Sequence, residues 1–400
     1  MPEDNSPPRL GGAAISQWLS DGATLETTLE DVFQGLCGRL AGSDLGLHRV
    51  ALFVTALHPN LVGSSYYWLR ETGSVRTFRA PHSVAETDEF NLNPTMTVMQ
   101  TGAEVRRRLC DQNCPDDYPI LAEFRGDGIT DYVAMPMRFV NGEVQIISYA
   151  TDRPRGFTKS HMKFLRQILP LITRLTEVHV LRSTAVDLLD AYLGKQSGAR
   201  VLDGQVKRGD GQDIHAVIWF SDLRDSTPLA ERLGRQEFLA VLNDYLECMA
   251  GAVLDHGGEV LRFIGDAALA IFPIGGSGGW DAAEACAVAV DAAGDAMDRM
   301  AALNAVRAGA GESRLGYGIG LHLGHVMYGN FGTPSRIEFT VIGAAANEAA
   351  RIEGQCKALG VNFLASESVV RNLDGPWRCL GAQRLKGISR AIDVFTLSEV

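Results

Sequence analysis

The sequence of 400 residues has no uninterrupted run of about 18 apolar residues, so we expect no transmembrane helix. Its first residues, MPEDNSPPRLGG, have neither the basic flank nor the apolar core of a secretory signal. A formal net charge of -11 leaves no basic field that would attract nucleic acid or an anionic membrane. We therefore expect a cytoplasmic, soluble protein with no nucleic-acid partner and no membrane span.

Cysteine is scarce, and the seven residues are an odd number scattered along the chain. Cys110 and Cys114 stand close together in CDQNCPDD, but no second pair completes a zinc site. We expect reduced thiols, with metal binding by this pair as the alternative.

The composition, 46% hydrophobic and 21% charged, is that of a globular protein of more than one domain. Residues 1–14, rich in proline, glycine and charge, are expected to be disordered. Apolar residues at helical spacing predict a helix over residues 25–40. Five strand-like runs follow: RVALFVTALH, SYYWLRE, VRTFRA, DYVAMPMRF and EVQIISYAT. Asn141-Gly142 between the last two is a hairpin signal, so the first half is expected to be α+β with an antiparallel sheet.

Residues 158–192 are expected to form one long helix with Thr158 as its N-cap and Pro170 near its start. Apolar residues alternate at spacings of four and three from Phe164 to Tyr192, with Arg182 at one core position. Such a heptad seam fits a helix packed on its own domain or a parallel coiled coil between two chains. The polar, glycine-rich segment after Gly194 resembles a linker.

Beyond Ile214, strands and helices alternate over about 190 residues, as in an α/β domain. Asp222 stands at the end of the strand IHAVIWF, and Asp266 at the turn of the hairpin GGEVLRFIGDAALAIF. A carboxylate placed beside buried strands is costly unless a cation such as Mg²⁺ compensates it. Each aspartate alone is equally compatible with a helix cap or a turn.

An ordered set of five motifs resembles the class III adenylate/guanylate cyclase catalytic domain across residues 213–400. The motifs are FSDLRDST, GGEVLRFIGDAALAIF, YGIGLHLGHVMYGNFG, FTVIGAAANEAARIE and RLKGISRAIDVFTL. The resemblance implies a ferredoxin-like fold and conversion of ATP to cyclic AMP and pyrophosphate at composite sites of a homodimer.

The same resemblance assigns a role to each matching residue. Asp222 and Asp266 would hold two divalent ions, Mg²⁺ or Mn²⁺. Asn347 would orient the ribose, Arg351 would neutralise charge developing on the α-phosphate, and Lys386 would contact the terminal phosphates.

Base choice would rest on Arg262 and Thr340, the positions at which the family reads the purine. Arginine replaces the lysine that is usual in adenylate cyclases, but its donors still suit the N1 acceptor of adenine. Ala344 is a second departure, from a common aspartate, and is expected to change packing only. The alternatives are a guanylate cyclase and a catalytically inactive nucleotide-binding module.

The first half resembles a GAF-type domain over residues 15–183, which implies a sensor for an unknown small-molecule or protein input. Residues 184–212 would then be the end of a signalling helix and a linker. The expected architecture is a two-domain α/β (α+β) protein with a sensor, a helical linker and a cyclase domain.

Overall fold

The computed structural model describes residues 12–23, 25–55, 61–275 and 279–398. The chain divides into two compact units, Met1–Leu188 and Leu189–Val400. Within the described ranges, no helix has both the length and the apolar character that crossing a membrane requires.

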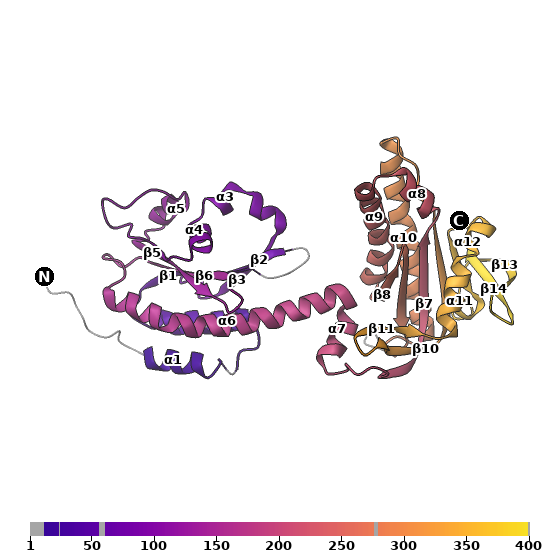
Figure 1. The fold of residues 1–400 in the computed structure, drawn as a ribbon, viewed down its shortest axis with the longest axis horizontal. Helices are drawn as coiled ribbons and strands as arrows, with labels where there is room; N and C mark the ends of the chain where they lie inside the picture. The colour runs from indigo at the N-terminus through magenta and orange to yellow at the C-terminus, as the bar shows by residue number, and fades with distance from the viewer. Residues whose placement is uncertain (1–11, 24, 56–60, 276–278, 399–400) are drawn as a thin grey trace. The chain divides into compact units, whose positions relative to one another are not determined.

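The first unit is built on a six-stranded antiparallel sheet in the order β3-β2-β1-β6-β5-β4 (Figure 1). Its strands are β1 (Leu47–Thr55), β2 (Leu61–Leu69), β3 (Val75–Pro81), β4 (Val105–Arg107), β5 (Asp131–Arg138) and β6 (Val144–Thr151). The predicted hairpin joins β5 to β6, with Gly142 in the left-handed region at φ 89°. The five predicted strands are therefore confirmed, and only the three-residue β4 was not expected.

Two early helices differ from expectation. Helix α1 (Gly12–Ser20) includes residues 12–14, which were expected to be disordered, while residues 1–11 lie outside the described ranges. Helix α2 (Leu29–Ala41) begins four residues later than expected, because Thr28 and Asp31 form a capping box at its start. The other short helices are η1 (His82–Glu86), α3 (Asp88–Asn91), α4 (Pro94–Thr101) and α5 (Ile120–Gly126).

The predicted long helix is α6 (Lys159–Leu193), which continues through Pro170. Thr158 Oγ1 accepts a hydrogen bond from the backbone N–H of His161 at 3.1 Å, so Thr158 caps the helix as predicted. Phe164 and Ile168, at the start of the seam, are buried in the core of the first unit. Val178 and Tyr192 further along are 62% and 81% exposed. The first part of the seam therefore packs on its own domain, and the later part presents apolar side chains to solvent.

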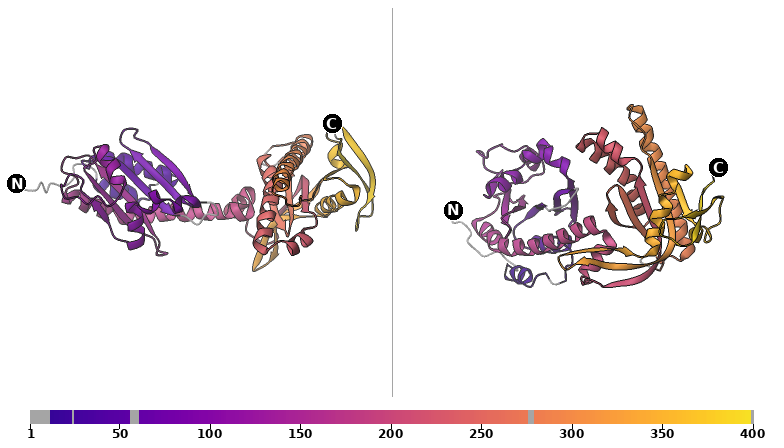
Figure 2. Two further views of the ribbon diagram at one scale, coloured as in Figure 1. Left: turned by 90° about the horizontal axis from the view of Figure 1, so that it is seen from above. Right: turned by 45° about the vertical axis from the view of Figure 1, so that its right-hand side comes forward.

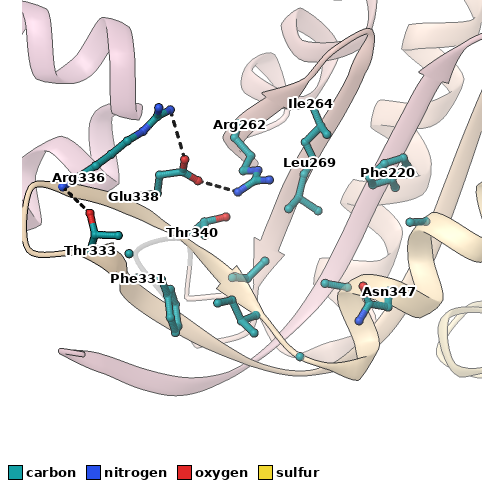
Figure 3. Close-up of a pocket in the computed structure, with 16 residues that line it drawn as sticks. Phe220, Arg262, Ile264, Leu269, Phe331, Thr333, Arg336, Glu338, Thr340 and Asn347 are labelled. Carbon is teal, nitrogen blue, oxygen red and sulfur yellow. Dashed lines mark hydrogen bonds and ion pairs between the residues drawn. The ribbon is translucent and has the colours of Figure 1, made fainter. Parts of the chain in front are cut away.

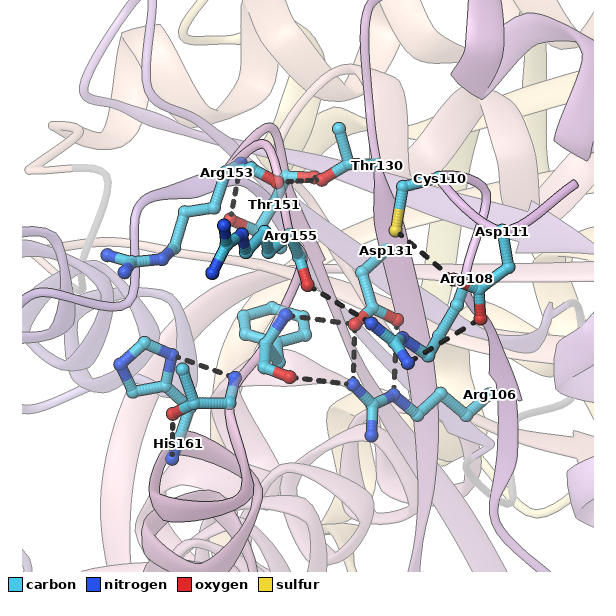
Figure 4. Close-up of polar contacts among 12 residues, drawn as sticks. Arg106, Arg108, Cys110, Asp111, Thr130, Asp131, Thr151, Arg153, Arg155 and His161 are labelled. Atoms are coloured by element: carbon cyan, nitrogen blue, oxygen red, sulfur yellow. Dashed lines mark hydrogen bonds and ion pairs between the residues drawn. The ribbon is translucent and has the colours of Figure 1, made fainter. Parts of the chain in front are cut away.

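A buried ion pair links β4 to β5 and also contacts the segment just before α6 (Figure 4). Asp131 is fully buried and accepts from Arg106 Nε at 3.1 Å and Arg106 Nη2 at 2.6 Å. The backbone N–H of Phe157 also donates to Asp131, at 2.9 Å. Cys110, drawn beside this network in Figure 4, and Cys114 are both free thiols.

The second unit contains a mixed, mostly antiparallel sheet in the order β13-β14-β12-β10-β7-β9-β8, with β11 paired to β10 (Figures 1 and 2). Its strands are β7 (Gly211–Leu223), β8 (Glu259–Ile264), β9 (Ala267–Pro273), β10 (Tyr317–Thr333), β11 (Arg336–Ile342), β12 (Phe363–Ser366), β13 (Trp377–Arg384) and β14 (Ala391–Leu397). Strands β7 to β10, with helices α9 (Arg235–Asp255) and α10 (Ala282–Gly309), follow the βαββαβ order and confirm the ferredoxin-like fold.

Helices cover both faces of this sheet. Successive β7 residues Val217 and Ile218 point to opposite faces and are both fully buried, which explains why IHAVIWF reads as a continuous apolar run. Val217 belongs to the core formed with α9 and α10, and Ile218 to the core formed with α11 (Ala344–Glu353) and β11. Three further short helices are α8 (Ser226–Arg232), α12 (Cys356–Leu359) and α13 (Glu367–Val370).

The segment expected to be a linker is partly folded. It contains α7 (Lys195–Leu202), whose Ser197 is fully buried and donates a hydrogen bond to Glu259 of β8 at 2.6 Å. Helix α7 therefore packs within the second unit.

Candidate functional site

The two aspartates predicted to hold metal ions lie together at one end of the second unit's sheet. Asp222 is the last but one residue of β7, and its register partner on β9 is Ala267. Asp266 precedes Ala267 in the turn that joins β8 to β9, where Gly265 has a φ of 67°. The pairing of β7 with β9 thus brings together two carboxylates that are 44 positions apart in the sequence.

The electrostatics of Asp222 show how close the two groups are. Burial, followed by the negative charge of Asp266 and a hydrogen bond with Asp266, raises the pKa of its carboxyl to about 6. Two half-buried carboxylates whose charges repel each other attract a cation that would offset both charges. Among the described residues, no group of three or more histidine, cysteine or acidic side chains is arranged to hold a metal ion.

A third carboxyl group, Glu353 at the end of α11, was missed by the sequence analysis. Its residue is 8% exposed, and burial, followed by the charge of Asp222, raises its pKa to about 7. A Cβ added to Gly318 of β10 would lie 2.1 Å from Glu353 Oε1, so this carboxyl fills the space left by the glycine. Glycines inside a strand mark a close approach, and Gly318 was the signal that could have located Glu353.

The residues predicted to read the purine line a separate cavity of about 540 Å³ (Figure 3). Arg262 comes from β8, Thr340 from β11 and Asn347 from α11, and apolar side chains such as Phe220 and Leu269 complete the walls. A cavity with apolar walls and a few polar groups is suited to a planar heterocycle with hydrogen-bonding edges.

Within this cavity, Arg262 is held by a carboxylate that the sequence analysis did not single out. Arg262 Nη1 donates to Glu338 Oε2 at 2.7 Å, and Arg336 Nη2 lies 3.6 Å from Glu338 Oε1 (Figure 3). Glu338 and Thr340 are two residues apart on β11 and therefore lie on the same face of the strand.

Thr340 is 4% exposed, and its hydroxyl oxygen has no hydrogen-bond partner within the described part of the chain. Buried hydroxyls are almost always paired. Because the side chain lines the cavity, a ligand there could supply the missing partner.

The remaining predicted residues lie apart from the cavity. Arg351 is exposed on α11, one helical turn beyond Asn347, and Lys386 is exposed in the turn between β13 and β14. Neither side chain has a hydrogen bond or ion pair to another described residue. Ala344 is exposed at the start of α11, and the packing change expected from its substitution stays a prediction.

The family match lies within the second unit. Residues 212–397 match the family model described as the adenylate and guanylate cyclase catalytic domain. The adenylate cyclase of Anabaena cylindrica is 41% identical over 172 residues, which are 43% of this chain and 33% of that protein. Adenylate cyclase 1 of Rhizobium meliloti (strain 1021) is 30% identical over 188 residues, which are 46% of this chain and 27% of that protein. This chain thus spans about one third or less of these curated relatives.

Among solved structures, the adenylyl cyclase CyaB from P. aeruginosa is 25% identical with a TM-score of 0.43. The similarity covers 48% of this chain and 97% of that chain.

Proposed function

We propose, from the membership of residues 212–397 in the class III adenylate and guanylate cyclase family, that this protein converts ATP to 3′,5′-cyclic AMP and pyrophosphate. The observation that carries the proposal is the convergence of Asp222 and Asp266 at one end of the sheet, in the same unit as a cavity that Arg262, Thr340 and Asn347 line.

The reaction forms a bond between the ribose 3′-oxygen and the α-phosphorus and breaks the bond from that phosphorus to the bridging oxygen of the β-phosphate. The proton of the 3′-hydroxyl passes to solvent, and pyrophosphate leaves with the electron pair of the broken bond. Carboxylates with substrate phosphates suit Mg²⁺ or Mn²⁺, so Asp222 and Asp266 would hold such ions. Held by these two carboxylates, the ions would lower the pKa of the 3′-hydroxyl and offset the charge of the triphosphate.

The other residues position the nucleotide. An Arg262 N–H donates to N1 of adenine, and the Thr340 hydroxyl accepts from its 6-amino group. Asn347 orients the ribose, Arg351 stabilises charge that develops on the α-phosphate, and Lys386 binds the terminal phosphates. Arg351 and Lys386 have no other partner among the described residues, which leaves both cations available to phosphate.

We further propose that the active form is a homodimer, in which the aspartates of one chain and the nucleotide-binding residues of another form each site. Exposed apolar residues support this proposal. Phe263 and Ile264, beside the Asp266 turn, are 53% and 40% exposed, and Ile342 at the end of β11 is 50% exposed. The exposed part of the α6 seam, from Val178 to Tyr192, provides a second surface for pairing as a parallel coiled coil.

The first unit, with its antiparallel sheet and flanking helices, is proposed to act as a GAF-like sensor whose input reaches the second unit through α6. Deletion of residues 1–188, the first unit, tests this role: activity and its regulation should both change, and an unchanged enzyme would refute it.

Purified full-length protein incubated with ATP or GTP and Mn²⁺ or Mg²⁺ tests the activity. The expected result is cyclic AMP from ATP, with a much lower yield of cyclic GMP. Formation of cyclic GMP alone would show a guanylate cyclase, and no cyclic product from either nucleotide would show an inactive module.

A further inference from the structure

A buried polar cluster lies next to the proposed nucleotide site and has no part in the function proposed above. Its centre is Glu348 of α11, whose side chain is only 12% exposed. One Glu348 oxygen, Oε2, lies 2.8 Å from His322 Nε2 and 3.3 Å from Arg390 Nη2. Glu348 follows Asn347 directly, so any constraint on its side chain also constrains the helix that carries Asn347 and Arg351.

His322 fixes Glu348 from the side of the sheet. The ring lies on β10, is 4% exposed, and its Nδ1 is 2.9 Å from the Ser366 hydroxyl at the end of β12. Burial lowers the pKa of His322, which favours the neutral ring. With the serine hydroxyl donating to Nδ1, the remaining proton is on Nε2 and is donated to Glu348. Two neighbouring strands therefore set the position of this carboxylate.

Arg390 extends the cluster to the turn that carries Lys386. That turn connects β13 to β14, and Leu385 at its start is 3% exposed in a core that includes Ile352 of α11. The packing of Leu385 is the first contact of this turn with α11, and the ion pair between Arg390 and Glu348 is the second. Lys386 lies between these two attachments, and its side chain is exposed.

We propose that Glu348 is a positioning residue, which fixes the Lys386 turn to the helix of Asn347 and Arg351 so that the three side chains meet one nucleotide. This inference rests on the proposed function, because it assigns Lys386 to the terminal phosphates. Arg390 is 69% exposed, and an ion pair with an exposed arginine contributes little to stability. Its effect should therefore appear in phosphate binding and not in folding.

The test uses Arg390→Ala in the full-length chain, with Arg390→Lys as the conservative variant and Glu348→Gln as the partner variant. Arg371→Ala is the matched control, because it removes an exposed i,i+4 ion pair with Glu367 elsewhere in the same unit. The readouts are KM and kcat for ATP, inhibition by pyrophosphate, inhibition by adenosine, and thermal unfolding.

For Arg390→Ala and Glu348→Gln, we expect KM for ATP and the inhibition constant of pyrophosphate to rise together by about 3- to 10-fold, with kcat changed less than about twofold. Inhibition by adenosine should not change, because adenosine has no phosphates. Arg390→Lys should restore most of the lost affinity for ATP and pyrophosphate. The double variant, Arg390→Ala with Glu348→Gln, should show no larger rise in KM than the more impaired of the two single variants, because both changes remove the same ion pair. Arg371→Ala should behave as the unchanged protein.

Unchanged pyrophosphate inhibition in Arg390→Ala, or additive losses in the double variant, would overturn the inference. If Glu348→Gln does not fold, the kinetics and pyrophosphate inhibition of Arg390→Ala and Arg390→Lys decide between the two outcomes. If the unchanged protein forms no cyclic product, the proposed function fails separately. Calorimetric titration of pyrophosphate into the unchanged protein and Arg390→Ala then tests the positioning role alone, and equal affinities would refute it.

Discussion

Arg262 Nη1 and Glu338 Oε2 are 2.7 Å apart on the wall of the cavity proposed to hold the purine. This ion pair aligns the guanidinium and at the same time neutralises the only carboxylate among the lining residues in the described chain. Guanine presents two N–H donors that a free carboxylate would accept, whereas N1 of adenine requires a donor. Under the proposed function we therefore expect the pair to favour adenine, because Arg262 supplies a donor and Glu338 is no longer free to accept from guanine.

Arg262→Ala is expected to lower the preference for ATP over GTP by about 10- to 100-fold, because one charge-assisted hydrogen bond is lost and Glu338 is released. The measurement is kcat/KM for both nucleotides. Arg336→Ala is the control, since Arg336 lies 3.6 Å from the same carboxylate without a hydrogen bond. An equal loss with ATP and GTP would contradict this account.

Thr340→Val should separate stability from activity. The buried Thr340 hydroxyl has no partner in the described protein, so its loss should leave the free energy of unfolding unchanged or raise it by up to about 1 kcal/mol. KM for ATP should rise about 10-fold, because the 6-amino group of adenine loses its acceptor. Urea unfolding and steady-state kinetics measure the two effects, and a less stable variant with normal KM would argue for a structural role.

Composite sites predict rescue between inactive variants. Asp222→Ala and Arg351→Ala should each be inactive, since one lacks a metal ligand and the other lacks the cation at the α-phosphate. In an equal mixture, half of the dimers are mixed and carry one intact site of two, so about a quarter of normal activity should return. Failure of rescue, with chain exchange confirmed, would place both residues in a site of one chain.

The exposed part of the α6 seam gives a prediction for assembly. Val178→Glu should weaken dimerisation and lower activity at dilute protein concentration, because like charges would face each other across the seam. Ser183→Glu is the control, since Ser183 is exposed on the same helix and is not a seam position. Analytical ultracentrifugation and the dependence of specific activity on concentration provide the measurement, and a dimer that tolerates Val178→Glu would contradict the coiled coil.

The buried carboxyls predict how stability depends on pH when no metal is present. The pKa of Glu353 is raised to about 7 and that of Asp222 to about 6, so the folded chain binds more protons than the unfolded chain between roughly pH 4 and 7. The free energy of unfolding should therefore fall as pH rises through this window. Glu353→Gln should reduce that fall by on the order of 1–3 kcal/mol.

Urea unfolding at pH 5 and pH 8, with a chelator or with Mn²⁺, measures this dependence. Divalent ions should reduce the fall, because they compensate the carboxylates that become charged. A flat profile in the presence of the chelator would contradict the prediction.

The sequence alone was sufficient to predict most strands, the long helix and its cap at Thr158, because hydrophobic periodicity and capping are local properties. It also predicted Asp222 and Asp266 through ordered motifs. Helix α7 was missed because its stability comes from contacts such as Ser197 with Glu259, 62 positions away. A contact between residues so far apart in the sequence cannot be predicted from the composition of α7.

Tertiary structure alone decided which charged groups face each other. Glu338 aligns Arg262, Glu353 fills the space beside Gly318, and Glu348 joins His322 to Arg390. In the sequence each of these glutamates resembles an ordinary polar residue of a strand or a helix. Their partners lie on other elements, and only the pairing of strands and the packing of α11 on the sheet bring each carboxylate to its partner.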